Sequence, residues 1–274
     1  MGKYKLAAFD MDGTLLNSKK EISPATLAAL KKAAASGKYI ALSTGRCLPE
    51  LYKYFKEVPE LRYAICVSGG MVYDAQTKSF IYENALSPEI CLKLFDALKD
   101  KDVMPHMLTE LSTVQRSHAE NMENYSMAIY KEMFLRVGTL VDNIYDYYKS
   151  NPIPLHKLNF YHRSPEDRED SRRIVEALGL PIEIVYAEKA SLECSALGVT
   201  KGRGIEELAK HLGISVEETI MVGDAPNDIA GLKTAGLSVA MGNALPEIKA
   251  ICDVTVSDCD HDGCAEVIEK YLLN

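Results

Sequence analysis

Residues 9–14 read FDMDGT and follow the apolar stretch YKLAA, which is typical of a short buried strand. Two carboxylates, Asp10 and Asp12, therefore stand one residue apart at the expected end of that strand. At about 4 Å and an effective dielectric constant of about 20, two negative charges repel by roughly 4 kcal/mol. A cation, a proton or a helix N-terminus is needed to offset this repulsion. Taken alone, the stretch also fits a plain strand-to-turn junction, because Asp-Gly is a common turn pair.

Strand and helix patterns alternate at both ends of the chain. After the first strand, Ser23-Pro24 marks the start of a helix that Gly37 ends. Short, continuously apolar strands that alternate with helices are typical of a parallel sheet covered on both faces. The sequence therefore predicts an α/β fold with a Rossmann-like, doubly wound parallel-sheet core. The further strand patterns read KYIALS (38–43), YAICVS (63–68), ETIMVGD (218–224), LSVAMG (237–242) and DVTVSD (253–258).

The middle of the chain has a different pattern. Helices that carry Tyr, Met and His are expected at 119–135 and 139–150, and a helix rich in acidic and basic residues at 165–179. We therefore expect an α+β domain at residues 84–189. It would be inserted between two parts of one core domain, residues 1–83 and 190–274.

Composition and charge narrow the classes of protein. The chain has 274 residues, 47% of them hydrophobic, which is enough to bury a full core. Because the net charge is −8 and the basic residues are scattered, nucleic acid is not an expected partner. The apolar runs are too short to span a bilayer, and the start of the chain lacks the apolar segment of a signal peptide. Seven cysteines without a C-x-x-C pair fit a reducing compartment. We expect a cytoplasmic monomer or weak homo-oligomer with no membrane partner.

Residues 258–264, DCDHDGC, contain three side chains of metal-binding type: Cys259, His261 and Cys264. Their spacing matches no structural zinc pattern. We interpret the stretch as an acidic turn, with Asp262 near the N-terminus of the last helix.

Polar residues follow several of the predicted parallel strands. Asp10 and Asp12 follow the first strand, Ser43 and Thr44 end the second, and Asp224 ends the strand at 218–224. In an open parallel sheet, ligands bind beyond the carboxyl ends of the strands. We therefore expect these side chains to meet at one edge of the sheet.

Three further residues near helix starts extend this set. Asn227 and Asp228 come shortly after Asp224, and Lys201 lies in VTKGRG. Each also fits a plainer role, since Asn and Asp cap helices and most lysines are solvated. Thr44-Gly45 likewise fits a simple helix entry.

The combined set suits phosphoryl transfer. Three carboxylates around one point suit Mg²⁺, which takes oxygen ligands and usually keeps a substrate phosphate oxygen and several waters. Lys201, the Thr44 hydroxyl, the Asn227 amide and loop N–H groups are donors for phosphate oxygens. An Asp carboxylate can attack phosphorus once a metal and a lysine neutralise the incoming phosphate. A cation between the carboxylates would also offset the repulsion between Asp10 and Asp12.

Four stretches resemble, in order, the four motifs of the haloacid dehalogenase-like (HAD) hydrolase superfamily: FDMDGTLL, LSTGR, VTKGRG and VGDAPNDIAGLKTAG. The inserted domain resembles the α/β cap of the Cof-type (type IIB) phosphatases by its position and rough pattern. The resemblance implies a Mg²⁺-dependent phosphatase that acts through an aspartyl-phosphate intermediate. Its substrates would be small phosphomonoesters, such as sugar phosphates or related phosphorylated metabolites.

The resemblance also implies a role for each matching residue. Asp10 would be the nucleophile and Asp12 the general acid/base. Asp228 would support the lysine or the metal shell. The metal ligands would be Asp10, the Asp12 backbone carbonyl and Asp224. The phosphate ligands would be the Met11 backbone, Thr44, Gly45, Lys201 and Asn227.

The sequence departs from the family pattern at two places. The family often has Asn-Gly near residues 68–70, where this chain has Gly-Gly, which could alter a substrate contact. Ala225-Pro226 stiffens the loop after Asp224. Arg46 fits either a surface or supporting charge or a substrate contact. The four histidines of the inserted domain are interpreted as structural or surface-exposed: His106, His118, His156 and His162.

Two other functions stay open at this point. A phosphomutase of the phosphomannomutase type would keep the chemistry and change the phosphate acceptor. A phosphate-binding regulator would keep the phosphate-binding site and lack catalysis. The presence of all expected catalytic residues argues against this alternative. Sugar phosphates, nucleotides, flavin mononucleotide and pyridoxal phosphate all remain candidate substrates.

Overall fold

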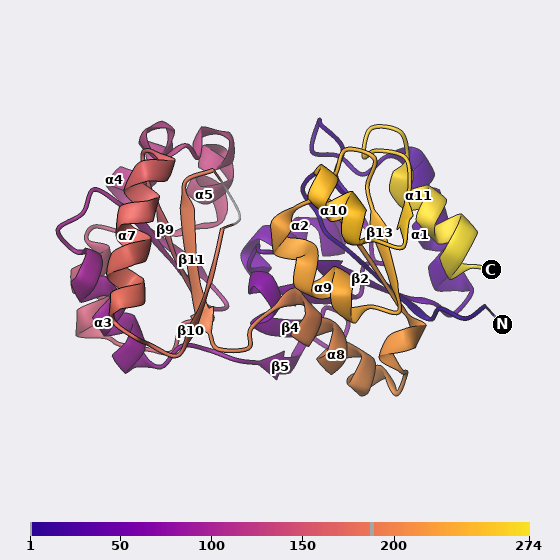
Figure 1. Ribbon diagram of the computed structural model, residues 1–274, viewed down its shortest axis with the longest axis horizontal. Coiled ribbons are helices and arrows are strands. Elements are labelled where there is room, and N and C mark those ends of the chain that lie inside the picture. Colours follow the sequence, from indigo (N-terminus) through magenta and orange to yellow (C-terminus); the bar gives the residue numbers. More distant parts are fainter. Residues whose placement is uncertain (1, 187–188) are drawn as a thin grey trace. The chain divides into compact units, whose positions relative to one another are not determined.

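The computed structural model describes residues 2–186 and 189–274. This part of the chain divides into two compact units, each with its own sheet (Figure 1). The first unit holds the chain up to Arg46, together with Tyr52–Glu83 and Thr200–Asn274. The second unit holds Cys47–Leu51 and Asn84–Val199.

The sheet of the first unit has the strand order β14-β13-β12-β1-β2-β3-β4-β5. The strands from β14 to β3 are parallel, which confirms the predicted core. β4 and β5 add an antiparallel hairpin that the sequence did not predict. The bounds are β1 (Leu6–Phe9), β2 (Tyr39–Ser43), β3 (Tyr63–Cys66), β4 (Met71–Asp74), β5 (Ser79–Glu83), β12 (Thr219–Gly223), β13 (Leu237–Ala240) and β14 (Val254–Thr255).

Helices cover both faces of this sheet. On one face α8, α9 and α10 pack in a row over β3, β12 and β13; on the other, α1 and α11 pack together beside β1 and β2. The bounds are α1 (Pro24–Ala35), α2 (Leu48–Glu57), α8 (Lys201–Leu212), α9 (Ile229–Thr234), α10 (Pro246–Ile251) and α11 (Gly263–Val267). Short helical turns are η1 (Val67–Gly69), η4 (Val216–Glu218), η5 (Pro226–Asp228) and η6 (Ile268–Leu272).

The start of α1 follows the expected capping chemistry. The Ser23 hydroxyl accepts a hydrogen bond from the Thr26 backbone N–H at 3.1 Å, and Pro24 occupies the first turn. Gly37 lies just beyond the end with a φ of 75°, a conformation that glycine adopts without strain. The predicted bounds of this helix are confirmed.

The sheet of the second unit has the strand order β10-β11-β9-β6-β7-β8. All neighbours in it are antiparallel except β7 and β8. One face packs against α3 and α7 in a single apolar cluster, and Figure 1 shows α7 lying along β9 and β11. The strands are β6 (Met104–Leu108), β7 (Ser112–Gln115), β8 (Thr139–Val141), β9 (Lys157–Tyr161), β10 (Ile182–Val185) and β11 (Ser191–Ala196).

The helices of the second unit differ from the prediction in two places. The helix expected at 119–135 is broken into short turns, and Ser126 within it has a left-handed backbone with φ of 60°. The segment 139–150 begins as β8 on the edge of the sheet, and its helix starts only where Asn143 caps it. The helical elements are α3 (Pro88–Leu98), α4 (Arg116–Ala119), η2 (Met122–Tyr125), η3 (Ala128–Tyr130), α5 (Lys131–Val137), α6 (Ile144–Ser150) and α7 (Pro165–Ala177).

The second boundary of the inserted domain also differs from the expected residue 189. β11 pairs with β9 and β10, so its hydrogen bonds place it in the sheet of the second unit. The chain returns to the first unit between Val199 and Thr200. Within the described residues, every helix is too short or too polar to cross a lipid bilayer.

Candidate active site

The predicted site residues gather around β1, the strand where the order of the first sheet reverses. β1 pairs in parallel with β2 on one side and with β12 on the other. Asp10, Thr44 and Asp224 directly follow these three neighbouring strands. Such a reversal point opens a crevice beyond the strand ends, where α/β proteins bind ligands.

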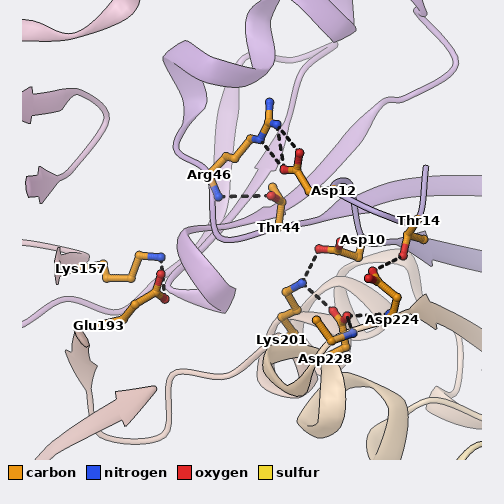
Figure 2. A network of polar contacts seen from close by, with 11 residues as sticks. Asp10, Asp12, Thr14, Thr44, Arg46, Lys157, Glu193, Lys201, Asp224 and Asp228 are labelled. Atoms are coloured by element: carbon orange, nitrogen blue, oxygen red, sulfur yellow. Dashed lines mark hydrogen bonds and ion pairs between the residues drawn. The ribbon is translucent and has the colours of Figure 1, made fainter. Parts of the chain in front are cut away.

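Lys201 joins two of the carboxylates. It is the first residue of α8, behind the N-cap Thr200, and its side chain is fully buried. Its ammonium lies 2.6 Å from Asp10 Oδ1 and 2.6 Å from Asp228 Oδ1 (Figure 2). Burial works to lower the pKa of Lys201, but the charges of the two carboxylates outweigh burial and raise it. Lys201 is therefore a buried ammonium held between two aspartates.

Asp228 braces the loop after β12. Its Oδ1 accepts from Lys201, while its Oδ2 accepts from the backbone N–H groups of Asp224 and Ala225 at 3.0 and 3.1 Å. Both oxygens are thus engaged, and the side chain is fully buried. These contacts fit the supporting role expected for Asp228.

The stretch FDMDGT (9–14) holds the Asp224 carboxylate in place. The Thr14 hydroxyl donates to Asp224 Oδ1 at 2.8 Å. Gly13 has a φ of 83°, and a Cβ atom there would lie 2.6 Å from Asp224 Oδ2. Glycine is therefore required at position 13 both by the backbone conformation and by the close approach of the Asp224 carboxylate.

Gly13→Ala is expected to displace the Asp224 carboxylate and to weaken Mg²⁺ binding in calorimetric titration. It is also expected to lower the free energy of unfolding by more than about 1 kcal/mol. Gly37→Ala is the matched control, because Gly37 has a similar φ of 75° with nothing within 4 Å of its Cβ position. Equal Mg²⁺ affinity in both variants would contradict a metal site at Asp224.

A divalent cation fits this group of carboxylates. Ligand oxygens of Asp10, Asp224 and Asp228 all lie within 4.8 Å of one another. Because both Asp228 oxygens already accept hydrogen bonds, Asp10 and Asp224 are the better candidates for direct ligands. Burial raises the pKa of Asp10 above its usual range and raises that of Asp224 to about 6. A bound cation would favour the ionised carboxylates and lower both values.

Asp12 is held by two cations outside this group. Arg46 Nη2 lies 2.8 Å from each Asp12 oxygen, and Lys20 Nζ lies 2.7 Å from Oδ1. In Figure 2 the Asp12 carboxylate points towards Arg46 rather than towards Lys201. Burial works to raise the pKa of Asp12, but Arg46 and Lys20 together hold it below its usual range.

Lys20 was not predicted, and the role of Arg46 had been left open. The turn that returns Lys20 to Asp12 is tied by the Asn17 side chain, which accepts from the backbone N–H groups of Lys19 and Glu21. Lys20 itself has a φ of 62°. Asn17 was the only sequence signal for this turn, since asparagine often bonds to the backbone two residues on.

A strained turn supports the loop that contains Thr44. The backbone N–H groups of Val67 and Ser68 donate to the carbonyls of Arg46 and Thr44 at 2.9 and 3.0 Å. Val67, Ser68 and Gly69 all have positive φ, at 53°, 60° and 100°. A Cβ atom at Gly69 would lie 2.0 Å from the Thr200 carbonyl oxygen. This turn therefore fits closely between the Thr44 loop and the start of α8.

The other expected phosphate ligands have different surroundings. The Asn227 amide oxygen is buried and has no hydrogen-bond partner among the described residues. Met11, expected to contribute only its backbone, is fully buried. Gly45 follows Thr44, whose hydroxyl oxygen accepts from the Arg46 backbone N–H at 3.2 Å.

The side chains of the stretch 258–264 make other contacts. The Cys264 thiol donates to the Thr14 carbonyl, and His261 bonds to Asp258 at 2.7 Å. Asp262 directly precedes α11, as expected, but its side chain bonds to Ser23 instead of capping the helix. In the second unit His106, His156 and His162 are buried and His118 is half-buried.

Residues 7–268 match the family model of the haloacid dehalogenase-like hydrolases. The chain belongs to this family. The resemblance found in the four motifs is therefore confirmed. A solved structure of the HAD subclass IIB sugar phosphatase BT4131 aligns with a TM-score of 0.82 and 25% identity, covering 97% of this chain and 98% of that one. The predicted fold class is confirmed with it.

Curated HAD-family relatives include named phosphatases of nearly equal length. The 5-amino-6-(5-phospho-D-ribitylamino)uracil phosphatase YcsE of Bacillus subtilis (strain 168) is 27% identical over 98% of this chain and 96% of its own length. The pyridoxal phosphate phosphatase YbhA of Escherichia coli (strain K12) is 25% identical over 98% of this chain and 99% of its own length. The chain spans about half (47%) of another relative, the chloroplastic endoribonuclease YBEY of Arabidopsis thaliana, at 28% identity.

Proposed function

We propose that this HAD-like hydrolase is a Mg²⁺-dependent phosphatase that hydrolyses small phosphomonoesters through an aspartyl-phosphate (acyl phosphate) intermediate on Asp10. The observation that carries the proposal is the buried Lys201 ammonium bound to both Asp10 and Asp228 beside Asp224. The named phosphatases among the relatives support the same reaction.

In the proposed first step, an Asp10 oxygen attacks phosphorus and the bond from phosphorus to the substrate oxygen breaks. The two cations that contact Asp12 favour its ionised form, so Asp12 would first turn away from them and take up a proton; it would then give that proton to the leaving oxygen. Lys201 and the Thr44 loop hold the phosphate oxygens with N–H and O–H donors. A Mg²⁺ ion at Asp10, Asp224 and the Asp12 carbonyl would neutralise phosphate charge during the transfer.

In the second step, water attacks the phosphorus of phospho-Asp10. Asp12 takes the proton from this water, which restores its protonated form as Asp10 is released. The net reaction converts a phosphomonoester and water into an alcohol and inorganic phosphate. Arg46 and Lys20 contact the Asp12 carboxylate and favour its ionised form, which is the form that takes the proton from water.

Excess chelator is expected to abolish hydrolysis, and added Mg²⁺ is expected to restore it. Ca²⁺ is expected to inhibit, because its larger and looser coordination would misplace the Asp10 oxygen. Inorganic phosphate released from p-nitrophenyl phosphate measures the activity. Full activity in chelator would contradict the metal assignment. Nitrophenol release that depends on an added sugar acceptor and yields no inorganic phosphate would favour a phosphomutase.

A further inference from the structure

The segment directly after Asp12 is fastened to two loops from the far end of the chain. Both loops lie in the first unit, as Asp12 does. One is the loop between β13 and α10, which carries Asn243, and the other is the acidic turn at residues 258–264. The chemistry at Asp10 does not otherwise involve either loop.

Asn243 joins the stretch FDMDGT (9–14) to the acidic turn through the two ends of its carboxamide. Its Nδ2 donates to the Gly13 carbonyl at 2.8 Å, and its Oδ1 accepts from the Cys259 backbone N–H at 3.0 Å. A carbonyl only accepts and an N–H only donates, so these two partners settle which end of the amide is the nitrogen. One side chain therefore ties Gly13 to a residue 230 positions further along the chain.

Asp12 and Gly13 are the two central residues of a tight turn. The Thr14 backbone N–H donates to the Met11 carbonyl at 3.4 Å, and Gly13 has a φ of 83°. A positive φ at the third residue is typical of a type II turn. Because glycine has wide backbone freedom, such a turn needs an outside contact to keep one conformation. The Asn243 amide supplies this contact at the Gly13 carbonyl.

The acidic turn (258–264) holds the segment a few residues further on. Asp260 Oδ1 accepts from the Ser18 backbone N–H at 2.9 Å. Ser18 belongs to the turn that brings the Lys20 ammonium within 2.7 Å of Asp12 Oδ1. The two loops therefore support both the peptide after Asp12 and a residue that contacts the Asp12 side chain.

The Asn243 contact matters more for geometry than for stability. Its side chain is exposed, so its hydrogen bonds compete with water and contribute little to the stability of the fold. Catalysis is more sensitive, because a shift of about 1 Å in a reacting group can cost about 100-fold in rate. Loss of this contact should therefore affect proton transfer by Asp12 before it affects folding.

We infer that Asn243 is a positioning residue, which holds the peptide after Asp12 so that the Asp12 carboxyl group can exchange protons with substrate oxygens. The inference rests on the proposed function, in which Asp12 is the general acid/base. The Asp12 side chain turns from its two cations towards the substrate about a main chain that Asn243 keeps in place. Asp10 is held by Lys201 instead, so the attack on phosphorus depends less on Asn243.

The test compares phenyl phosphate with p-nitrophenyl phosphate, because phenolate leaves less readily than nitrophenolate without a proton. For both substrates kcat/KM reports the first phosphoryl transfer. Asn243→Ala is expected to lower kcat/KM by about 10-fold or more for phenyl phosphate and by less than about 3-fold for p-nitrophenyl phosphate. Its melting temperature is expected to fall by less than about 4 °C.

Asn243→Asp separates the two contacts of the carboxamide. It keeps the acceptor for the Cys259 N–H and loses the donor to the Gly13 carbonyl, so it is expected to show the same selective loss. Its added charge acts alike on two substrates that carry the same phosphate group, and cancels in their ratio. Leu245→Ala is the matched control, because Leu245 is exposed on the same loop, and it is expected to change neither kcat/KM.

A double variant tests whether Asn243 acts through Asp12. In single turnovers with phenyl phosphate, Asn243→Ala/Asp12→Asn is expected to be no slower than Asp12→Asn alone, because both changes impair the same proton transfer. Additive losses, equal losses on the two substrates, or Asn243→Asp behaving like the wild type would overturn the inference. A wild-type protein that hydrolyses neither aryl phosphate would overturn the proposed function itself.

Discussion

Asp10→Asn is expected to abolish the turnover of every phosphomonoester, because it removes the oxygen anion that attacks phosphorus. Asp12→Asn is expected to behave differently with different leaving groups. A sugar alkoxide leaves poorly without a proton, and acid–base assistance of this kind is worth about 10²–10⁴-fold. An aryl phosphate needs little assistance, so its phosphate should move to Asp10 and remain there, since no base activates water.

Rapid mixing of Asp12→Asn with p-nitrophenyl phosphate is expected to give a burst of nitrophenol approaching one equivalent per enzyme. Mass spectrometry should then locate the phosphate on Asp10. The two variants are controls for each other, because each replaces one carboxylate of the same loop by an amide. A burst from Asp10→Asn would reverse the two roles, and undiminished activity in both variants would refute the mechanism.

Lys201→Met is expected to be the most damaging single change to both stability and activity. It leaves the buried carboxylates of Asp10 and Asp228 without their shared cation. Removing one partner from a buried ion pair lowers the free energy of unfolding by about 3–5 kcal/mol. Urea unfolding without metal measures this loss, and added Mg²⁺ is expected to reduce it by supplying another positive charge.

Lys210→Met is the matched control, because Lys210 lies on the same helix with an 81% exposed side chain. It is expected to change neither stability nor activity. The double variant Lys201→Met/Asp228→Asn is expected to recover part of the stability without recovering activity, since Asp10 still lacks its lysine. A fully active Lys201→Met variant would remove Lys201 from the proposed site.

The sequence predicted the centre of the site because strand ends in a parallel sheet obey a general geometric rule. Asp10 and Asp224 each follow a short apolar strand, and the rule places such residues on one edge. Lys201 was a weaker prediction, because a lysine near a helix start has no intrinsic tendency to be buried. The structure brings all three together, while their chemical roles stay predictions.

The sequence does not predict which group a long side chain contacts or where the backbone adopts a strained conformation. Lys20 reaches Asp12 through a turn whose only sequence signal was one asparagine. Val67 adopts a φ of 53°, which β-branched residues avoid, so local propensity argued against the turn that supports the Thr44 loop. β11 was assigned to the wrong unit because its partner strands are chosen by tertiary contacts rather than by local pattern.

The ends of the inserted unit meet each other within that unit. The Asn84 amide donates to the Leu197 carbonyl at 3.4 Å, although more than a hundred residues separate them in the chain. The parallel pairing of β1 with β12 has to close a loop that contains the whole insertion, and such closure becomes less favourable as loops lengthen. An insertion that folds first removes its own length from this loop, because its two ends are then already together. The folding order of the two units therefore controls how quickly the discontinuous core can assemble.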